Sequence, residues 1–133
     1  MSRTMSLRTE HIDILVVDSR PEDYAQLAAS PASRGMLFQF ATSGADALKL
    51  WRTGSRSIWL INLRLSDGSG AELAAAIRAR DPRSVVYVVG DRYDPAEEIE
   101  ARICGAAMYV CKPAEMSWLA LAASEHPRLA HCA

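Results

Sequence analysis

The chain has 133 residues, of which half are hydrophobic and 23% are charged, as is ordinary for a single globular domain. Fifteen basic and sixteen acidic residues give a net charge of -1, so no basic field favours a nucleic-acid partner. No apolar run approaches the roughly 18–20 residues of a membrane helix, the first ten residues lack a signal-peptide core, and three cysteines are too few for a disulfide scaffold. We therefore expect a cytoplasmic protein without a membrane partner.

Five short apolar segments alternate with stretches that are typical of helices. Continuous apolar runs suit strands that are buried on both faces of a parallel sheet. The predicted strands, in chain order, are Ile12–Val17, Met36–Phe40, Ile58–Ile61, Val85–Val89 and Met108–Cys111. Helices are predicted to begin at Pro21, after Ser43, after Gly70, at about Pro95 and after Pro113.

The regular alternation predicts an α/β fold with a doubly wound, five-stranded parallel sheet. We expect one domain over residues 11–125, between tails at residues 1–10 and 126–133. In such a sheet, ligands bind at the carboxyl ends of the strands. Among the five loops there, Asp18-Ser19, Asn62-Leu63 and Lys112-Pro113 carry charged or amide side chains placed to converge on one crevice.

Three segments resemble the response-regulator receiver (CheY-like) family. They are ILVVD at 14–18 followed by Arg20-Pro21, LINLRLSDGSG at 60–70 and GAAMYVCKP at 105–113, in the family's order and at similar separations. The resemblance covers about residues 11–125 and implies the flavodoxin-like (βα)5 fold with strand order 2-1-3-4-5. It also implies a role in two-component phosphorelay signalling, in which a kinase phosphorylates an aspartate after the third strand. We therefore expect a signalling protein and not an enzyme.

Departures from the family pattern predict a receiver that is not phosphorylated at the usual site. Asn62 stands at the phosphoacceptor position, and its neutral amide is not the carboxylate nucleophile that acyl-phosphate formation requires. Asp18 matches the first of two metal-binding acids, but Ser19 replaces the second. With one carboxylate left of three, we expect Mg²⁺ to bind weakly at most, and no other cofactor. Reverting Asn62 alone is not expected to restore full phosphorylation.

Three further positions correspond to family residues that contact the phosphoryl group or belong to the switch. Val89 is assigned to the hydroxyl residue after the fourth strand, and valine cannot hydrogen-bond a phosphoryl group. Tyr109 retains the aromatic residue of the switch position, and Lys112 retains the lysine that pairs with the phosphoryl group. Two interpretations of Asp18 with Lys112 stay open: mutual neutralisation in a partly buried crevice, or binding of a small anion or cation.

Loss of phosphorylation predicts action through protein–protein contact with a kinase, another receiver, an effector or a second copy of the chain. The alternative hypothesis is a small-ligand or ion sensor that uses the crevice around Asp18, Ser19, Asn62 and Lys112. A weaker hypothesis is residual phosphoryl acceptance at Asp18 or Asp91.

The surface of the fourth helix, fifth strand and fifth helix is the predicted interface, because receivers commonly pair through it. A homodimer through this surface is a further expectation. We predict that Trp118 and Leu121 point outward there while Leu119 faces the core. The alternative is that Trp118 lies back over the edge of the core. The glutamates at positions 97, 98 and 100 are expected to form a solvated face or to border the interface.

Overall fold

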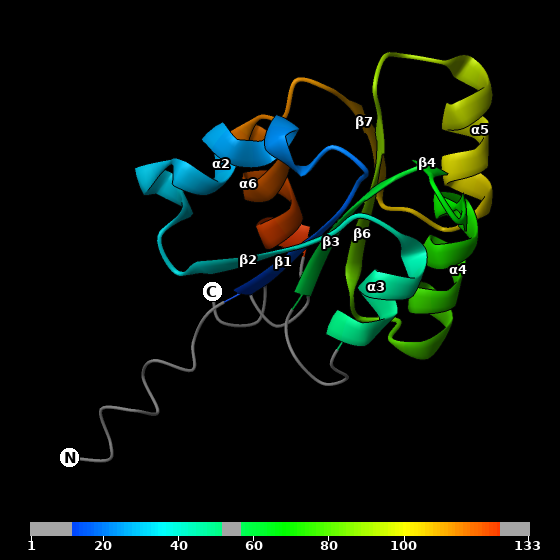
Figure 1. The fold of residues 1–133 in the computed structure, drawn as a ribbon, viewed down its shortest axis with the longest axis horizontal. Helices are drawn as coiled ribbons and strands as arrows, with labels where there is room; N and C mark the ends of the chain where they lie inside the picture. The colour runs from blue at the N-terminus through cyan, green and yellow to red at the C-terminus, as the bar shows by residue number, and fades with distance from the viewer. Residues whose placement is uncertain (1–11, 52–56, 126–133) are drawn as a thin grey trace.

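Five parallel strands form the central sheet of the computed structural model, which describes residues 12–51 and 57–125 (Figure 1). The strands β1 (Ile12–Val17), β2 (Met36–Ala41), β3 (Ser57–Asn62), β6 (Val85–Gly90) and β7 (Met108–Cys111) lie in the order β2-β1-β3-β6-β7. This confirms the predicted order 2-1-3-4-5, because β4 and β5 form a small separate hairpin. The predicted tails, residues 1–10 and 126–133, lie outside the described residues.

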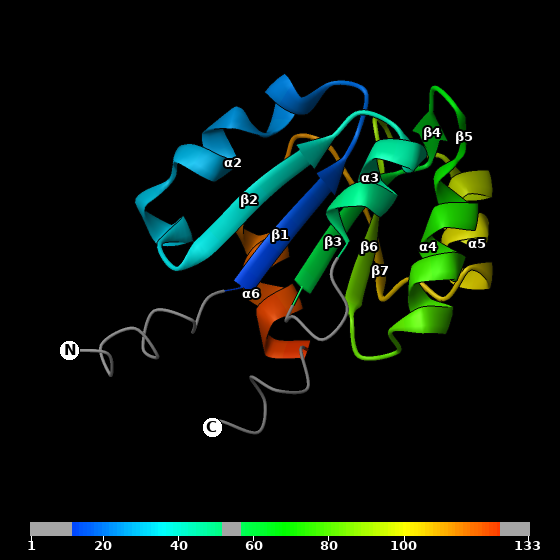
Figure 2. The same ribbon diagram turned by 60° about the horizontal axis from the view of Figure 1, so that its bottom comes forward.

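Helices cover both faces of the sheet (Figures 1 and 2). One face carries α2 (Ala25–Ala29) and α6 (Met116–Glu125), and the other carries α3 (Gly44–Leu50), α4 (Gly70–Arg80) and α5 (Pro95–Ile103). Successive strand residues point to opposite faces, so β3 and β6, which are buried along their whole length, contribute to two separate cores. None of the described helices is long and apolar enough to cross a membrane.

The first crossover contains only a short helix. The segment predicted to be helical from Pro21 forms a 3-10 turn, η1 (Pro21–Tyr24), then the five-residue α2, then a second turn, η2 (Pro31–Ser33). Pro31 ends α2 because its ring moves the preceding residue, Ser30, to extended backbone with φ −67° and ψ 137°. Within η1 and α2 only Tyr24 and Leu27 are buried, so this layer leaves part of β2 uncovered.

A close backbone approach fixes the loop between β3 and α4. The hairpin of β4 (Arg64–Leu65) and β5 (Gly68–Ser69) lies between them, and the N–H of Gly70 donates to the carbonyl of Leu63 at 2.9 Å. A Cβ atom on Gly70 would overlap the carbonyl oxygen of Asn62 and lie 2.9 Å from the Cα of Leu63. The start of α4 therefore packs directly on the end of the strand that carries Asn62.

Asp67 ties this hairpin to the start of α3. Its two carboxylate oxygens accept hydrogen bonds from the N–H groups of Gly44 at 2.9 Å and Ala45 at 3.0 Å, which lower the pKa of Asp67. A pKa lowered on folding stabilises the fold above the unfolded-state pKa of about 4, and this stabilisation is lost as the pH falls through the folded-state pKa. The contribution of Asp67 is therefore greatest near neutral pH.

We expect Asp67→Asn to lower the melting temperature at pH 7 and to reduce its dependence on pH below about pH 4. Thermal denaturation followed by circular dichroism at several pH values measures both effects. The matched control is Asp46→Asn, an exposed aspartate in the first turn of the same helix, which is expected to change the acid dependence less. An unchanged acid profile in Asp67→Asn would contradict this role.

Candidate functional site

Four strand ends bring Asp18, Asn62, Asp91 and Lys112 together at one edge of the sheet. The Nδ2 atom of Asn62 lies 3.0 Å from Oδ2 of Asp18 and 3.1 Å from Oδ1 of Asp91. The Nζ atom of Lys112 lies 3.0 Å and 2.9 Å from these same two carboxylate oxygens. An amide and an ammonium group therefore both lie between two carboxylates.

Lys112 contacts a third carboxylate, that of Asp23, at 2.7 Å. Burial lowers the pKa of Lys112, but its hydrogen bonds to Asp23, Asp91 and Asp18 outweigh burial, so this pKa is raised above its ordinary value. The hydrogen bond from Lys112 in turn lowers the pKa of Asp91. An ammonium group has three N–H donors, and each has a carboxylate within reach. These contacts favour mutual neutralisation over binding of an external ion.

Asp18 is almost completely enclosed, with 1% of its surface exposed. Its Oδ1 accepts a hydrogen bond from the N–H of Arg20 at 2.9 Å, and its Oδ2 accepts one from the hydroxyl of Tyr24 at 2.8 Å as well as those from Asn62 and Lys112. Burial, and next the charge of Asp18, raise the pKa of Tyr24, so its hydroxyl stays a donor. Asp18 is therefore enclosed, with both carboxylate oxygens hydrogen-bonded within the chain.

The carboxamide of Asn62 is held in one orientation. Its Oδ1 accepts a hydrogen bond from the N–H of Arg64 at 2.8 Å, while its Nδ2 donates to Asp18 and Asp91. A carboxamide suits this position, because the backbone N–H on one side of it is a donor and the two carboxylates on the other side are acceptors. A carboxylate here would instead bring another negative oxygen beside Asp18 and Asp91.

The residues present do not fit the Mg²⁺ that the family implies. Mg²⁺ needs octahedral oxygen ligands, but the ammonium of Lys112 already lies 2.7–3.0 Å from one oxygen of each of three carboxylates. Ser19, which stands at the second acidic position, is exposed and brings no charge. In the part of the chain that the structure describes, no group of three or more His, Cys, Asp or Glu side chains could hold a metal ion.

Val89 does not line the site. Its side chain is fully buried in the core on the α2 and α6 side of the sheet. The next residue, Gly90, adjoins Tyr109, because a Cβ on Gly90 would lie 2.5 Å from the Tyr109 hydroxyl. Neighbouring strand residues face opposite sides, so a shift of one position in the assignment moves the side chain to the other face. Gly90 offers no hydroxyl group either.

Tyr109 and Glu97 extend the polar network away from Asn62. The Tyr109 hydroxyl lies 3.0 Å from Oε1 of Glu97 and accepts a hydrogen bond from the N–H of Asp94 at 3.1 Å. Burial and the hydrogen bonds to Cys111 and Glu97 raise the pKa of Tyr109. Oε2 of Glu97 accepts from Nε of Arg64 at 3.1 Å. Glu97 is buried, so its prediction as part of a solvated face is wrong.

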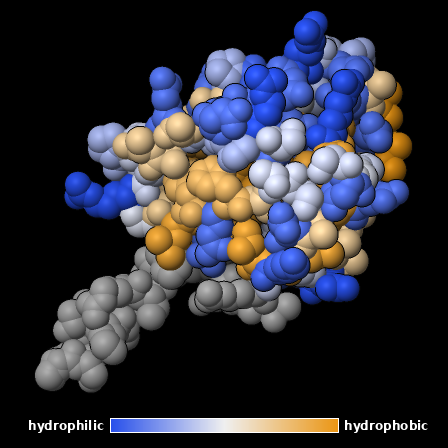
Figure 3. Space-filling view, in the orientation of Figure 1, coloured by the Kyte–Doolittle hydropathy of each residue, from blue (hydrophilic) through white to orange (hydrophobic). Residues whose placement is uncertain are grey.

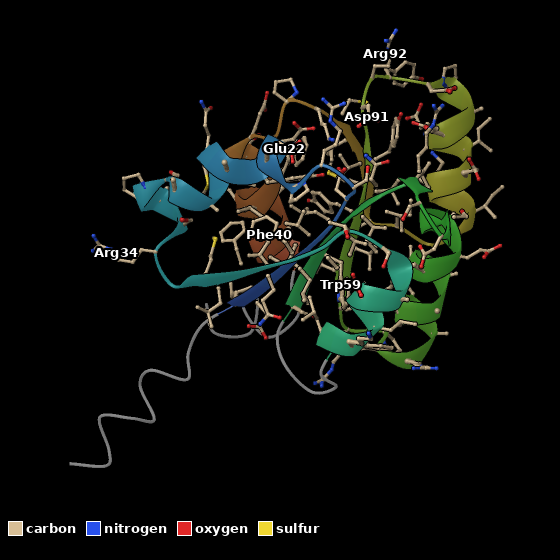
Figure 4. All side chains as sticks on the ribbon, viewed as in Figure 1. Glu22, Arg34, Phe40, Trp59, Asp91 and Arg92 are labelled. Carbon is tan, nitrogen blue, oxygen red and sulfur yellow. The ribbon has the colours of Figure 1, made fainter. Side chains whose placement is uncertain are left out.

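A cleft of about 540 Å³ opens over these residues and reaches the loop after β6, where Figure 4 labels Asp91 and Arg92. Its lining contains four cationic and four anionic side chains, beside Tyr93: Arg20, Arg64, Arg92 and Lys112, with Asp23, Asp91, Asp94 and Glu97. The two signs are equal in number, and several of these groups pair with one another. The cleft therefore has no excess charge that would select a small ion.

The two residues of α6 that were predicted to point outward differ in their exposure. Trp118 is only 5% exposed and packs with Leu119 and Ala122 in the core, so its prediction as an outward residue is wrong. The helix turns the residues at i, i+1 and i+4 to the sheet, which is the alternative that the sequence left open. Leu121 is exposed, as predicted.

Sequence reasoning missed four residues that complete the site. Asp23, Tyr24, Arg64 and Glu97 contact the predicted residues directly. Asp23 and Tyr24 had a weak signal, since they follow the first strand within six residues of Asp18. Glu97 had none, because an acidic residue near the start of a helix is usually solvated.

Comparison with known proteins identifies the class. The model of the response regulator receiver domain matches residues 14–124, and the chain belongs to this family. The acid tolerance regulatory protein ActR of Rhizobium meliloti (strain 1021) is 31% identical over 114 residues, which are 86% of this chain and 59% of that protein. The chain thus spans little more than half the length of this curated relative.

Two solved structures share the fold. A CheY-like response regulator receiver domain protein from Methanospirillum hungatei JF-1 has a TM-score of 0.77 at 17% identity, over 92% of this chain and 99% of that one. A response regulator from Burkholderia pseudomallei, solved with a phosphorylated aspartic acid, calcium ion and citrate, has a TM-score of 0.72 at 25% identity, over 91% of this chain and 72% of that one.

Proposed function

We propose that this receiver is not phosphorylated at the usual site and works in two-component signalling through phosphorylation-independent contact with another cytoplasmic signalling protein. The observation that carries the proposal is the Asn62 carboxamide, which donates to Asp18 and Asp91 at the end of β3. The Burkholderia pseudomallei relative carries a phosphorylated aspartic acid. An amide oxygen is no comparable nucleophile.

The surroundings of Asn62 support the same proposal. Lys112 is held by three carboxylates of the chain itself, so its charge is already neutralised without a phosphoryl group. The Tyr109 hydroxyl is engaged by Glu97 and Asp94, beside a glycine that has no side chain with which to contact a phosphoryl group. The polar network is complete in the unmodified protein, which favours a signalling module in one fixed state and not an enzyme.

We place partner binding on the surface of α5, β7 and α6, which is also the surface where the sequence predicts a possible homodimer. Ile103 is 80% exposed, and Ile99 one turn earlier is also exposed, together with Leu121 on α6. The two isoleucines lie one turn apart on α5, and exposed apolar side chains that group on a surface in this way mark interaction sites. The alternative of a small-ligand sensor has a cleft of suitable size, but its balanced charges give that function less support.

Intact mass spectrometry after incubation with acetyl phosphate and Mg²⁺ tests the loss of phosphorylation. We expect no phosphoryl adduct on the natural protein, little on Asn62→Asp, and a clear adduct on the double variant Asn62→Asp/Ser19→Asp, which restores the nucleophile and the second acid. The double variant is the positive control for the scaffold. An adduct on the natural protein would overturn the proposal, and peptide mapping would then show whether Asp91 or another residue carries it.

A further inference from the structure

The strand β2 ends the sheet at the side opposite to β7. It is six residues long, Met36–Ala41, with the sequence MLFQFA, and contains no charged residue and no proline. Natural edge strands usually prevent pairing with other chains by charges, prolines, bulges or shortness. The other edge strand, β7, is short, with four residues. β2 has the length to pair and lacks the charges or prolines that would prevent it.

Apolar side chains of β2 are exposed on both faces of the sheet. Leu37 is 50% exposed and Phe40 is 40% exposed. Phe38 and Phe40 are two residues apart on one face, with ring centroids 6.3 Å apart and nearly parallel planes. Figure 3 shows hydrophobic surface over β2, and Figure 4 labels Phe40 there. The face of Phe38 and Phe40 is open because the first crossover, which covers this side of the sheet, contains only the five-residue α2.

We propose that β2 pairs antiparallel with β2 of a second copy of this chain, which joins two five-stranded sheets into one continuous sheet. A two-fold axis perpendicular to the sheet at Phe38 keeps the two aromatic faces on the same side. It places Met36 opposite Phe40 of the partner subunit and Phe38 opposite Phe38 of the partner subunit. Aromatic and aliphatic pairs that face each other across strands stabilise a sheet.

The absence of charge on β2 favours a second copy of this chain as its pairing partner. Like charges directly opposite each other destabilise a pair of strands, and an isologous pair repeats every side chain. Because β2 carries no charge, its own copy brings no repulsion; in this register apolar residues meet apolar residues on the face of Phe38 and Phe40, and Leu37 meets the neutral Gln39 on the other face. The surface lies at the opposite edge of the sheet from the α5, β7 and α6 surface, so the pairing is independent of the proposed partner contact.

Sedimentation equilibrium of the full chain over a range of concentrations tests the pairing. We expect a dimer for the natural protein and its loss in Leu37→Lys and Phe40→Lys, which place a charge at the strand edge. The control Leu48→Lys on α3 puts a lysine at a similarly exposed apolar position elsewhere and should remain dimeric, and Ile99→Lys on α5 tests whether the surface of α5, β7 and α6 holds the dimer instead. Far-ultraviolet circular dichroism confirms that each variant is folded.

Hydrogen exchange gives a second measurement that does not depend on substitution. Amide exchange at residues 36–41 is expected to slow as the protein concentration rises, whereas that of β7 should not change. A natural protein that stays monomeric at all concentrations would overturn the proposal. So would a dimer that Ile99→Lys abolishes and Phe40→Lys leaves intact, because that result places the interface on α5.

Discussion

Replacing Lys112 by methionine is expected to reduce the free energy of unfolding by about 3 kcal/mol, because removal of one member of a buried ion pair leaves its partner uncompensated. Asp18 is 1% exposed and would lose its cation, while Asp23 and Asp91 are more exposed and would regain water more easily. Methionine keeps the unbranched stem, so the change removes the charge with little change of packing. Urea denaturation at pH 7 measures the effect.

The pH dependence of the stability of Lys112→Met shows whether the loss comes from the missing charge or from altered packing. The hydrogen bond from Lys112 lowers the pKa of Asp91, so this stabilisation is present above the unfolded-state pKa of about 4 and is lost as the pH falls through the folded-state pKa. The difference between Lys112→Met and the natural protein should therefore narrow in acid. Adding Asp18→Asn should recover part of the stability at pH 7.

The control is Lys49→Met, which removes an exposed ion pair on α3, and we expect it to change the free energy of unfolding by less than about 0.5 kcal/mol. Equal effects at positions 112 and 49 would contradict the site as described.

Gly70→Ala is expected to destabilise the fold by about 3 kcal/mol or to prevent folding, because the added methyl group meets backbone atoms that cannot rotate away. The new Cβ would overlap the carbonyl oxygen of Asn62 and approach its carbonyl carbon at 2.9 Å. Relief requires α4 to move off the end of β3, which would break the hydrogen bond from Gly70 to Leu63 and disturb Asn62.

A matched substitution shows whether the effect comes from this clash or from any replacement of glycine by alanine at the first residue of a helix. Gly44 begins α3, and a Cβ there would lie 3.5 Å from the Asp67 carboxylate, which is ordinary contact. Gly44→Ala should change the melting temperature little, because its backbone does not need a glycine conformation. Comparable losses in Gly44→Ala and Gly70→Ala would show that the close approach at Asn62 is not the cause.

The sheet was predictable because β3 and β6 are buried on both faces and form unbroken apolar runs in the sequence, whereas the strand order followed from the resemblance to the receiver family. It was harder to predict from the sequence which face of a strand or helix a single residue occupies. Val89 and Gly90 differ by one position and face opposite sides, and Trp118 differs from Leu121 by less than one helical turn. Only tertiary packing settles which of such neighbours faces the core.

The site was predictable as a set of strand ends but not as a network. Asp18, Asn62 and Lys112 follow buried strands, so their meeting point could be inferred. The contact of Lys112 with Asp23 joins residues 89 positions apart, and nothing local in the sequence specifies it. The same holds for the hydrogen bond from the Arg64 side chain to Glu97, 33 positions away, because this bond depends on how the β4–β5 hairpin lies against α5.

The contacts of Lys112 with three carboxylates have a consequence for how a cell could regulate the signalling output of this receiver. A receiver that changes state on modification reports how active its kinase is. Here, under the function proposed above, Lys112 and Asn62 already have their partners, so the fraction of molecules in the binding-competent state does not depend on a kinase. The remaining variable is the number of molecules, which sets the occupancy of any partner by mass action. Synthesis and degradation of the chain would then carry the signal, and the binding constant would set the copy number at which the response begins.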